Sequence, residues 1–413
     1  MQKNIVKAFQ KTVSWVQSFV HLHGVLLERF FLGVCTLFCI AQVADMLFPE
    51  TAKTIEYSRI VTDRSGNLLY PFLTSDEKWR MMTELHEITP ELRKAILFKE
   101  DKFFYLHYGV NPVAIVRAAV NNLLKRRRTS GASTITMQVA RLLAPKQRTY
   151  SNKLAEIARA IQLEWHYTKP QILQLYLNLV PYGSNIEGVK SASVLFFDKQ
   201  PNHLSLAEVT TLAIIPNRPT SLQIGKNNNL LTTARNNWLN RFAKARLFTK
   251  DAIEDAIAEP LSAKRLEAPK LAPHFAYKMK EKYPNLPIIK TNLRYDIQKK
   301  VETITGNYIK RLYSQHIRNA AVIVLNNRTH RIEAYVGSAD FLNVEDGGQV
   351  DGIKAIRSPG STLKPYLYAL AFDKGIITPK TQISDVPSNF SGYMPVNFDH
   401  TFNRSEERRV GKE

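Results

Sequence analysis

The chain has 413 residues, which is enough for more than one folded domain. A hydrophobic content of 44% excludes an intrinsically disordered chain. The only cysteines, Cys35 and Cys39, form no CxxC pair, which excludes a disulfide framework and a zinc ligand set. The formal net charge of +21 favours an anionic partner, which is nucleic acid, a lipid surface or a phosphorylated substrate. Charge alone does not choose among them, and it also fits a solvated basic surface.

An apolar segment lies near the N-terminus at residues 30–47, with Gln42 and Asp45 as its strongly polar positions. Roughly 20 apolar residues span a bilayer core, so this segment predicts an uncleaved transmembrane anchor. The basic side chains before it are Lys3, Lys7, Lys11 and Arg29. By the positive-inside rule they place residues 1–29 in the cytoplasm and the rest of the chain outside. The alternative is a buried core helix in a soluble protein.

The sequence after the anchor predicts a short β element followed by helices. Residues 59–70 alternate around a turn at Ser65 and Gly66, which predicts a hairpin within a pedestal of residues 48–85. Thr89 before a proline predicts the start of a helix, and Ser205 with Glu208 predicts a capping box. We expect a helical domain over residues 86–225. The polar, basic residues 226–300 predict a helical linker.

A second domain is expected from about residue 301, because the sequence becomes rich in β-branched residues. Residues 321–325 and 331–336 predict a second hairpin around a polar turn. A helix is expected to open at residues 357–365 and to stop at Gly375. These residues predict the start of an α/β domain over 301–403. The charged residues 404–413 do not continue the pattern and suggest a non-native tail.

Three short segments of the helical domain carry chemically capable side chains. Glu100 and Asp101 end a helix beside aromatic residues, which desolvate a carboxylate and suit a general acid or base. Residues 131–138 (GASTITMQ) lead a polar loop into a helix N-terminus, where free N–H groups can face a phosphate. Lys153 and Glu156 lie one helical turn apart. Taken alone, each segment is better explained by an ordinary structural feature. The first would be a solvated helix end, the second an N-cap and the third a surface ion pair.

The order and spacing of these segments resemble the peptidoglycan glycosyltransferase domain of class A penicillin-binding proteins and monofunctional glycosyltransferases. The family pattern is ED-x-x-F-x-x-H-x-G, then G-x-S-T-I-x-Q-Q, then R-K-x-x-E, then Y-L-N and a glycine-rich stretch. The matching positions are Glu100, Asp101, Phe104, His107, Gly109, Gly131, Ser133, Thr134, Ile135, Gln138, Lys153, Glu156, Tyr176, Leu177, Asn178, Gly183 and Gly188. The resemblance covers about residues 60–220 and implies a mainly α, lysozyme-like domain.

The resemblance also implies the chemistry. The donor is a glycan chain on a polyprenyl diphosphate, the acceptor is lipid II, and the acceptor C4 hydroxyl attacks with inversion. Glu100 is then the general base, and Glu156 orients the donor or a metal at the diphosphate. Arg141, Arg148 and Lys153 neutralise the leaving diphosphate. The remaining substrate-binding positions are Asp101, Phe104, His107, Ser133, Thr134, Gln138 and Asn178. No cofactor is certain, and a divalent cation such as Mg²⁺ stays open.

Two positions depart from the family pattern. Met137 stands in place of the first Gln of the pair, and Asn152 stands in place of the Arg before Lys153. The second departure weakens the case for a phosphate contact at that position, although Arg141 and Arg148 are close in sequence. With the anchor, the resemblance implies a single-pass protein of the inner membrane whose catalytic domains are periplasmic. Its expected partners are lipid II, the growing strand and other cell-wall synthesis proteins, and not nucleic acid.

A second motif, S-x-x-K, lies at Ser361 and Lys364 in SPGSTLKP. In this context it resembles the transpeptidase domain of penicillin-binding proteins, where the amine activates the serine as a nucleophile. That fold also requires S-x-N and K-T-G motifs, and neither follows here, since Lys380 and Thr381 precede Gln382. We therefore expect an incomplete, inactive domain from a truncated sequence.

Two further readings of the helical domain stay open. One is a lysozyme-like glycan hydrolase, which shares a helical fold and a catalytic Glu. The basic residues expected to face a diphosphate, together with the anchor, argue against it. The other is a non-catalytic cell-wall scaffold, which predicts loss of Glu100 or Glu156, and both are present.

Overall fold

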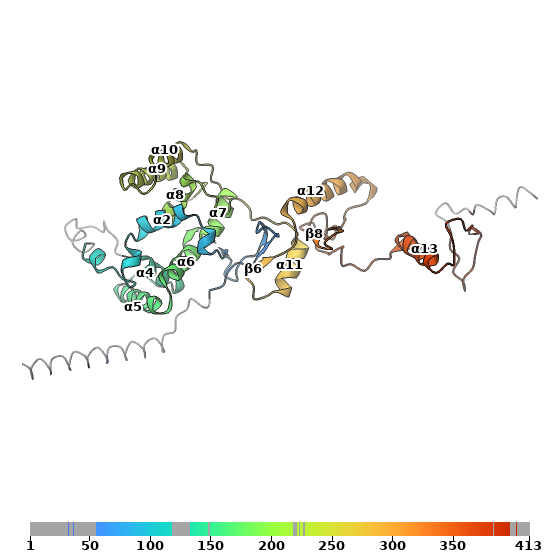
Figure 1. Ribbon diagram of the computed structural model, residues 1–413, viewed down its shortest axis with the longest axis horizontal. Helices are drawn as coiled ribbons and strands as arrows, with labels where there is room; N and C mark the ends of the chain where they lie inside the picture. Colours follow the sequence, from blue (N-terminus) through green and yellow to red (C-terminus); the bar gives the residue numbers. More distant parts are fainter. Residues whose placement is uncertain are drawn as a thin grey trace, which may run out of the picture. The chain divides into compact units, whose positions relative to one another are not determined.

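The computed structural model describes residues 55–117, 133–147, 149–217, 228–382 and 384–396, with residues 32, 36, 221, 222, 224, 225 and 402. The chain divides into two compact units, Met1–Ile353 and Lys354–Glu413 (Figure 1). Among the described residues, no helix has the length and apolar character needed to cross a bilayer. The anchor predicted at residues 30–47 lies outside them, apart from residues 32 and 36.

The first unit is built around a bundle of helices that share one hydrophobic core. Helix α4 packs against both α5 and α6, and α2 packs against α8. The apolar side chains of these helices, such as Leu92, Ile135 and Leu177, are fully buried. The helices are α2 (Pro90–Glu100), α4 (Ile135–Leu143), α5 (Tyr150–His166), α6 (Lys169–Leu179), α7 (Val189–Phe197) and α8 (Leu206–Ile214).

The predicted helix starts are confirmed because they depend on local hydrogen bonds. Helix α2 begins at Pro90, and the side chain of Thr89 accepts from the backbone N–H of Glu91. Helix α8 has the capping box expected from Ser205 and Glu208. A polar side chain that satisfies a free N–H fixes the first turn whatever packs around it.

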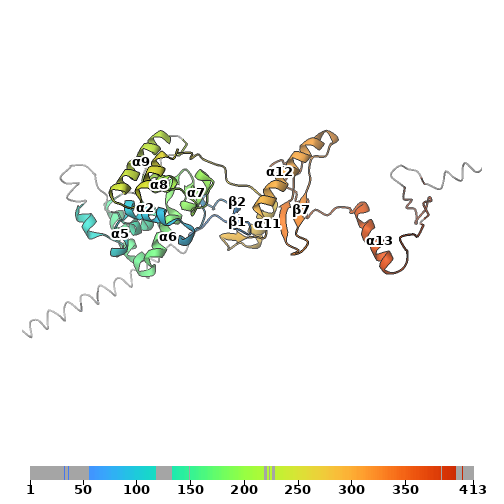
Figure 2. The same cartoon turned by 45° about the horizontal axis from the view of Figure 1, so that its top comes forward.

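Residues 226–300, expected to form a linker, instead belong to the folded unit. Helices α9 (Asn228–Lys244) and α10 (Lys250–Ala258) pack on α8 and on each other (Figure 2). Leu231, Leu239 and Phe242 of α9 are fully buried in the core. These apolar residues fall on one face of a helix whose other positions are mostly polar. The polar average composition of the segment therefore gave no indication that one face of the helix is buried.

A three-stranded sheet in the order β2-β1-β6 lies beside the helices. Strands β1 (Ile60–Thr62) and β2 (Leu68–Pro71) form the predicted antiparallel hairpin, and the Asp63 carboxylate accepts from two backbone N–H groups in its turn. Strand β6 (Ile288–Lys290), which the sequence did not predict, pairs with β1 in parallel. Helix α11 (Pro273–Lys282) covers this sheet through a small core that includes Val61 and Leu69.

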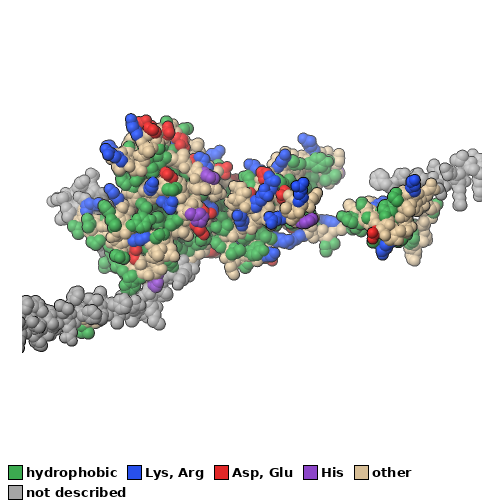
Figure 3. Space-filling view, viewed as in Figure 1, with side chains coloured by type: hydrophobic (Ala, Val, Ile, Leu, Met, Phe, Trp, Pro, Cys, Tyr) green, Lys and Arg blue, Asp and Glu red, His purple; other side chains and the backbone are tan. Residues whose placement is uncertain are grey.

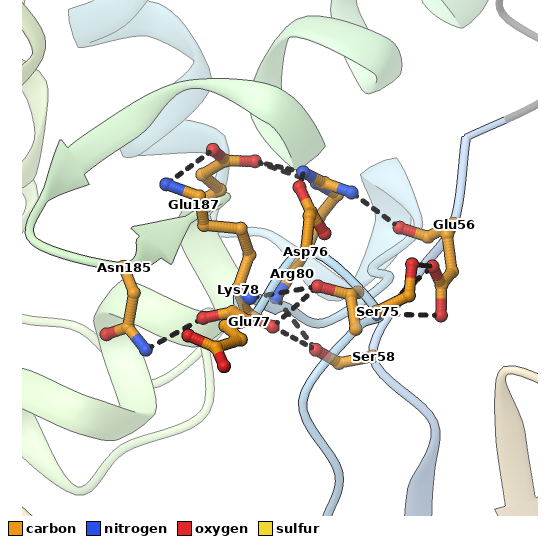
Figure 4. Close-up of polar contacts among 10 residues, drawn as sticks. Glu56, Ser58, Ser75, Asp76, Glu77, Lys78, Arg80, Asn185 and Glu187 are labelled. Atoms are coloured by element: carbon orange, nitrogen blue, oxygen red, sulfur yellow. Dashed lines mark hydrogen bonds and ion pairs between the residues drawn. The ribbon is translucent and has the colours of Figure 1, made fainter.

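A second small sheet, in the order β3-β5-β4, joins the segment before the helices to the loop after α6. Its strands are β3 (Trp79–Arg80), β4 (Pro181–Gly183) and β5 (Ile186–Glu187). The Arg80 guanidinium lies 2.7 Å from Glu187 and 2.8 Å from Asp76, and it donates to the Glu56 carbonyl (Figure 4). Asn185 donates to the Glu77 carbonyl. These bonds fix the hairpin segment to the helical core.

The last part of the first unit contains helix α12 (Tyr295–Leu312) and the predicted second hairpin. Strands β7 (Val322–Leu325) and β8 (Ile332–Val336) pair antiparallel, as expected. Helix α12 packs on β8, and the Gln298 side chain bonds to both the N–H and the carbonyl of Tyr335. This buried amide replaces the neighbouring strand that the backbone of β8 would otherwise need.

The second unit contains the 3-10 helix η6 (Gly360–Leu363) and helix α13 (Lys364–Asp373). None of the residues of α13 is buried. Gly375 has a φ of +66°, a value that favours glycine, so the predicted stop lies where a left-handed residue ends the helix.

The packed position of α9 gives a direct test. We expect Leu239→Ala to lower the free energy of unfolding by about 2–5 kcal/mol, because it leaves a cavity in the core. Leu230→Ala, on the exposed side of the same helix, is the matched control and should change it by about 0.5 kcal/mol or less. Urea unfolding followed by circular dichroism measures both. Equal effects of the two substitutions would mean that α9 does not pack as described.

Candidate active site

The Glu100 side chain lies at the C-terminal end of α2 and is 7% exposed. Its Oε1 accepts from the Lys99 ammonium, which is 2% exposed. Its Oε2 accepts from Gln138 Nε2 of α4 at 3.1 Å. The structure therefore brings the first and second predicted motifs together at this carboxylate.

Asp101, the next residue, holds the two motifs in place. Its Oδ2 accepts from the backbone N–H of Ile135 at 3.0 Å, at the start of α4. His107 Nε2 lies 3.0 Å from the same oxygen. Thr134 caps α4 by accepting from the Met137 N–H, and its hydroxyl donates to the Gly109 carbonyl. In this geometry Asp101, His107 and Thr134 support the site, and their contacts with substrate stay a prediction.

Two further residues of the first motif are held by packing. Phe104 is 1% exposed, and the Lys169 ammonium lies 4.5 Å from its ring centroid. Gly109 has a φ of +76°, and a Cβ there would lie 2.7 Å from the Ala160 carbonyl oxygen. Only glycine allows this close approach of the loop to α5.

The third motif meets the second through Lys153. Its ammonium lies 2.6 Å from Glu156 Oε1 and donates to the Ser133 hydroxyl at 3.0 Å. Lys153 is 39% exposed and Glu156 is 10% exposed. One cation is thus open to an anionic group while its partner carboxylate orients it.

The remaining predicted residues are Arg141, Arg148 and Asn178. Arg148 lies outside the described residues. Arg141 is in the last turn of α4 and is partly buried. Asn178 is 1% exposed, accepts from the Thr83 N–H and donates to the Thr83 carbonyl, each at 2.9 Å. Its amide joins two backbone segments, and a role in substrate binding stays a prediction.

Lys99, Tyr176 and Tyr182 lie near Glu100 and were not among the predicted site residues. Burial, and then the charge of Glu100, raise the pKa of the Tyr176 phenol well above its usual value. The same two causes raise the pKa of Tyr182. A sequence signal existed for Lys99, because Leu92, Ala95 and Ile96 mark the buried face of α2 and position 99 continues it.

The described residues contain no group of three or more His, Cys, Asp or Glu side chains that could hold a metal ion. Glu156, the carboxylate expected near a metal, has Oε1 bound to Lys153. The donor set therefore does not form a metal site made by the protein alone, and the chemistry below uses the chain's own residues.

The S-x-x-K motif is placed in the second unit. Ser361 lies in η6, Lys364 begins α13, and the Lys364 N–H donates to the Ser361 carbonyl. Both residues are exposed. Across the described residues no hydrogen bond joins the Ser361 hydroxyl to the Lys364 ammonium. The activation of Ser361 by Lys364 stays a prediction.

The sequence matches two family descriptions in the expected order. The model of the transglycosylase family matches residues 65–243. The model of the penicillin-binding protein transpeptidase domain matches residues 320–408. The chain belongs to the class A penicillin-binding proteins. It carries a mainly helical glycosyltransferase domain followed by part of a transpeptidase region.

Two members of the family are similar to this chain in sequence, and one solved structure aligns with it. The chain is 36% identical to penicillin-binding protein 1C of Escherichia coli, over 89% of this chain and 47% of that protein. It is 25% identical to penicillin-binding protein 1F of Bacillus subtilis, over 92% of this chain and 54% of that protein. The chain thus spans about half the length of these relatives. The crystal structure of penicillin-binding protein 1A from Haemophilus influenzae aligns with 84% of this chain and 58% of its own, at 16% identity and a TM-score of 0.36.

The supporting role of Asp101 leads to a second test. We expect Asp101→Ala to lower the free energy of unfolding by about 2–3 kcal/mol, because the Ile135 N–H and His107 both lose their buried acceptor. Asp251→Ala, at an exposed position in the first turn of α10, is the control and should cost about 1 kcal/mol or less. Thermal unfolding of both variants gives the comparison. A loss no larger than the control's would show that Asp101 does not join the motifs.

Proposed function

We propose that this chain polymerises lipid II into β-1,4 glycan strands, with Glu100 as the general base. The observation that carries the proposal is the Glu100 carboxylate itself. It is largely buried, bound by Lys99 and Gln138, and placed where the first two family motifs meet. A general base needs a fixed position, and these contacts hold the carboxylate in place.

In the proposed reaction Glu100 removes the proton from the C4 hydroxyl of the acceptor sugar. The hydroxyl oxygen forms a bond to the anomeric carbon of the donor while the bond from that carbon to the diphosphate oxygen breaks. The diphosphate leaves with the bonding electrons. Lys153, oriented by Glu156, supplies positive charge for it, together with Arg141 and Arg148. Ser133, held by Lys153, and Gln138 supply polar groups beside the reacting atoms.

A lipid-linked substrate requires the site to lie against a membrane, and the surface near the first motif suits that position. Several large apolar side chains there are exposed, and Figure 3 shows hydrophobic side chains on the lobe that carries α4 and α5. They are Phe103, Tyr105, Leu106, Tyr108, Val113, Val116, Leu154, Ile161 and Trp165. Exposed apolar clusters of this kind mark contact surfaces. We propose that this face meets the outer leaflet, with residues 30–47 as the anchor.

For the second unit the proposal is confined to the two residues of its S-x-x-K motif. In a chain that also carries the S-x-N and K-T-G motifs, Lys364 would activate the Ser361 hydroxyl, and Ser361 would then form the acyl-enzyme. This sequence contains neither motif after Ser361.

The proposal is tested by glycan polymerisation from lipid II in detergent. We expect Glu100→Gln to lower the rate by at least about 100-fold, since general-base catalysis contributes about 10²–10⁴-fold. Glu156→Gln should also lower it, because Lys153 loses its orienting partner. Glu254→Gln, an exposed carboxylate of α10, is the matched control and should leave the rate unchanged.

Polymer formation by Glu100→Gln at the parent's rate would contradict the assigned base. Cleavage of preformed glycan strands without polymerisation would favour the hydrolase. Neither activity in a folded parent chain would favour the scaffold.

A further inference from the structure

A cavity of about 190 Å³ lies in the part of the first unit where helices α11 and α12 both pack on strand β8 (Figure 1). Its lining comes from β2, α11, α12, the end of β8 and the loop after that strand, and it includes none of the residues placed around Glu100. The lining residues Lys270 and Asp340 are exposed, so the cavity is open to solvent. Sites for drug-sized molecules occupy roughly 300–1,000 Å³, so this smaller cavity suits a ligand about the size of a single ring.

Two polar side chains that line the cavity are buried without a hydrogen-bond partner. His274 is 8% exposed and Ser338 is 7% exposed. Neither His274 Nε2 nor Ser338 Oγ has a partner among the described residues. Because an unpaired buried polar group costs free energy, its position beside a cavity indicates that a bound group satisfies it. An imidazole nitrogen and a hydroxyl can each donate or accept, so they fit a ligand whose own groups do both.

The backbone beside His274 holds these groups in place. A Cβ on Gly337 would lie 2.6 Å from both Cγ and Nδ1 of the imidazole, so glycine lets the chain approach the ring closely. The Gly337 carbonyl accepts from the Gly352 N–H at 2.8 Å. This bond fixes the start of the loop that carries Ser338. The polar groups of the cavity are therefore positioned by the fold itself.

The charged groups of the lining do not favour an ion. Lys270 brings one amino group, while Glu302 and Asp340 bring two carboxyl groups, so there is no excess of positive charge for an anion. The Lys270 ammonium also lies 3.6 Å from a Glu267 carboxylate oxygen. Its charge in turn disfavours a cation, and no group of three His, Cys, Asp or Glu in the described part of the chain could hold a metal ion. A neutral ligand fits this lining best.

Aromatic rings complete the lining. Tyr70 and Phe341 both line the cavity, and the His274 ring meets Phe341 edge to face at 5.0 Å between centroids. Tyr277, which is 47% exposed, stacks on Phe341 with the centroids 5.6 Å apart. Apolar rings beside a few oriented polar groups are typical of small-molecule sites. A sugar ring matches both, because its C–H face packs on aromatic rings while its hydroxyl groups donate and accept.

We propose that this cavity binds one sugar unit of a glycan strand. The ring hydroxyls bond to His274 Nε2 and Ser338 Oγ, and the C–H face lies against Phe341. Glu302 offers a further partner, because both of its hydrogen bonds within the described residues end on Oε1, from the Ala272 N–H and from Gln298 Nε2. The site goes beyond the proposed polymerisation. Only the choice of a glycan strand as the source of the sugar rests on the proposed function.

The experiment measures binding of N-acetylglucosamine and of its β-1,4-linked dimer to the full chain in detergent by isothermal titration calorimetry. We expect Ser338→Ala to weaken binding of the dimer about 3- to 10-fold, the change that corresponds to one hydrogen bond. His274→Phe keeps an aromatic ring in the packing but removes Nε2, and it should weaken binding by a similar factor. Ser314→Ala removes an exposed hydroxyl just after α12 and is the matched control, with no change expected.

Thermal unfolding separates a binding role from a structural one. The Ser338 hydroxyl has no partner in the described protein, so Ser338→Ala should keep the parent's Tm while its affinity for the dimer falls. A lower Tm with unchanged affinity would overturn the proposal, because the hydroxyl would then serve the fold alone.

Three binding results would also overturn it. They are no binding of either sugar by the parent, equal affinity of the dimer for the parent and both cavity variants, and binding of the monosaccharide with exclusion of the dimer. The second would place the bound sugar at another site, and the third would exclude a strand. Because sugar binding needs no turnover, a failure here is distinct from polymerisation by Glu100→Gln at the parent's rate, which would refute the proposed base.

Discussion

The Asp101 carboxylate is the contact on which the geometry of the site depends. It accepts from the backbone N–H of Ile135 and pairs with His107, so one side chain joins the end of α2 to the start of α4. This bond places Gln138, one turn into α4, beside Glu100. Because the Ile135 N–H is free at the helix N-terminus, a carboxylate there satisfies it and also complements the helix dipole.

A second constraint acts through charge. Lys99 and Glu100 are both nearly excluded from water, and each is costly to bury without the other. Lys153 and Glu156 form a more exposed pair on α5. The difference in burial suits the proposed roles, since a base needs a fixed local charge while a cation for a leaving diphosphate must be reachable by substrate.

The active-site motifs are supported by parts of the chain far away in sequence. Strand β6 pairs with β1, and α9 completes the core and covers Lys99 through Trp238. The region expected to be a linker therefore helps to build the catalytic domain. The match to the transglycosylase family model extends to residue 243 and so includes nearly all of α9.

The sequence alone determined features that depend on neighbouring residues. Thr89, Ser205 and the hairpin turn at Asp63 to Asn67 form hydrogen bonds within a few positions, so their patterns were sufficient. The spacing of the motifs likewise identified the family. Only the tertiary structure decided that Asp101 joins two helices, that Asn178 bonds to the Thr83 backbone and that Lys99 is buried against Glu100. Each depends on which helix faces pack together, and that packing is set by contacts between residues distant in the chain.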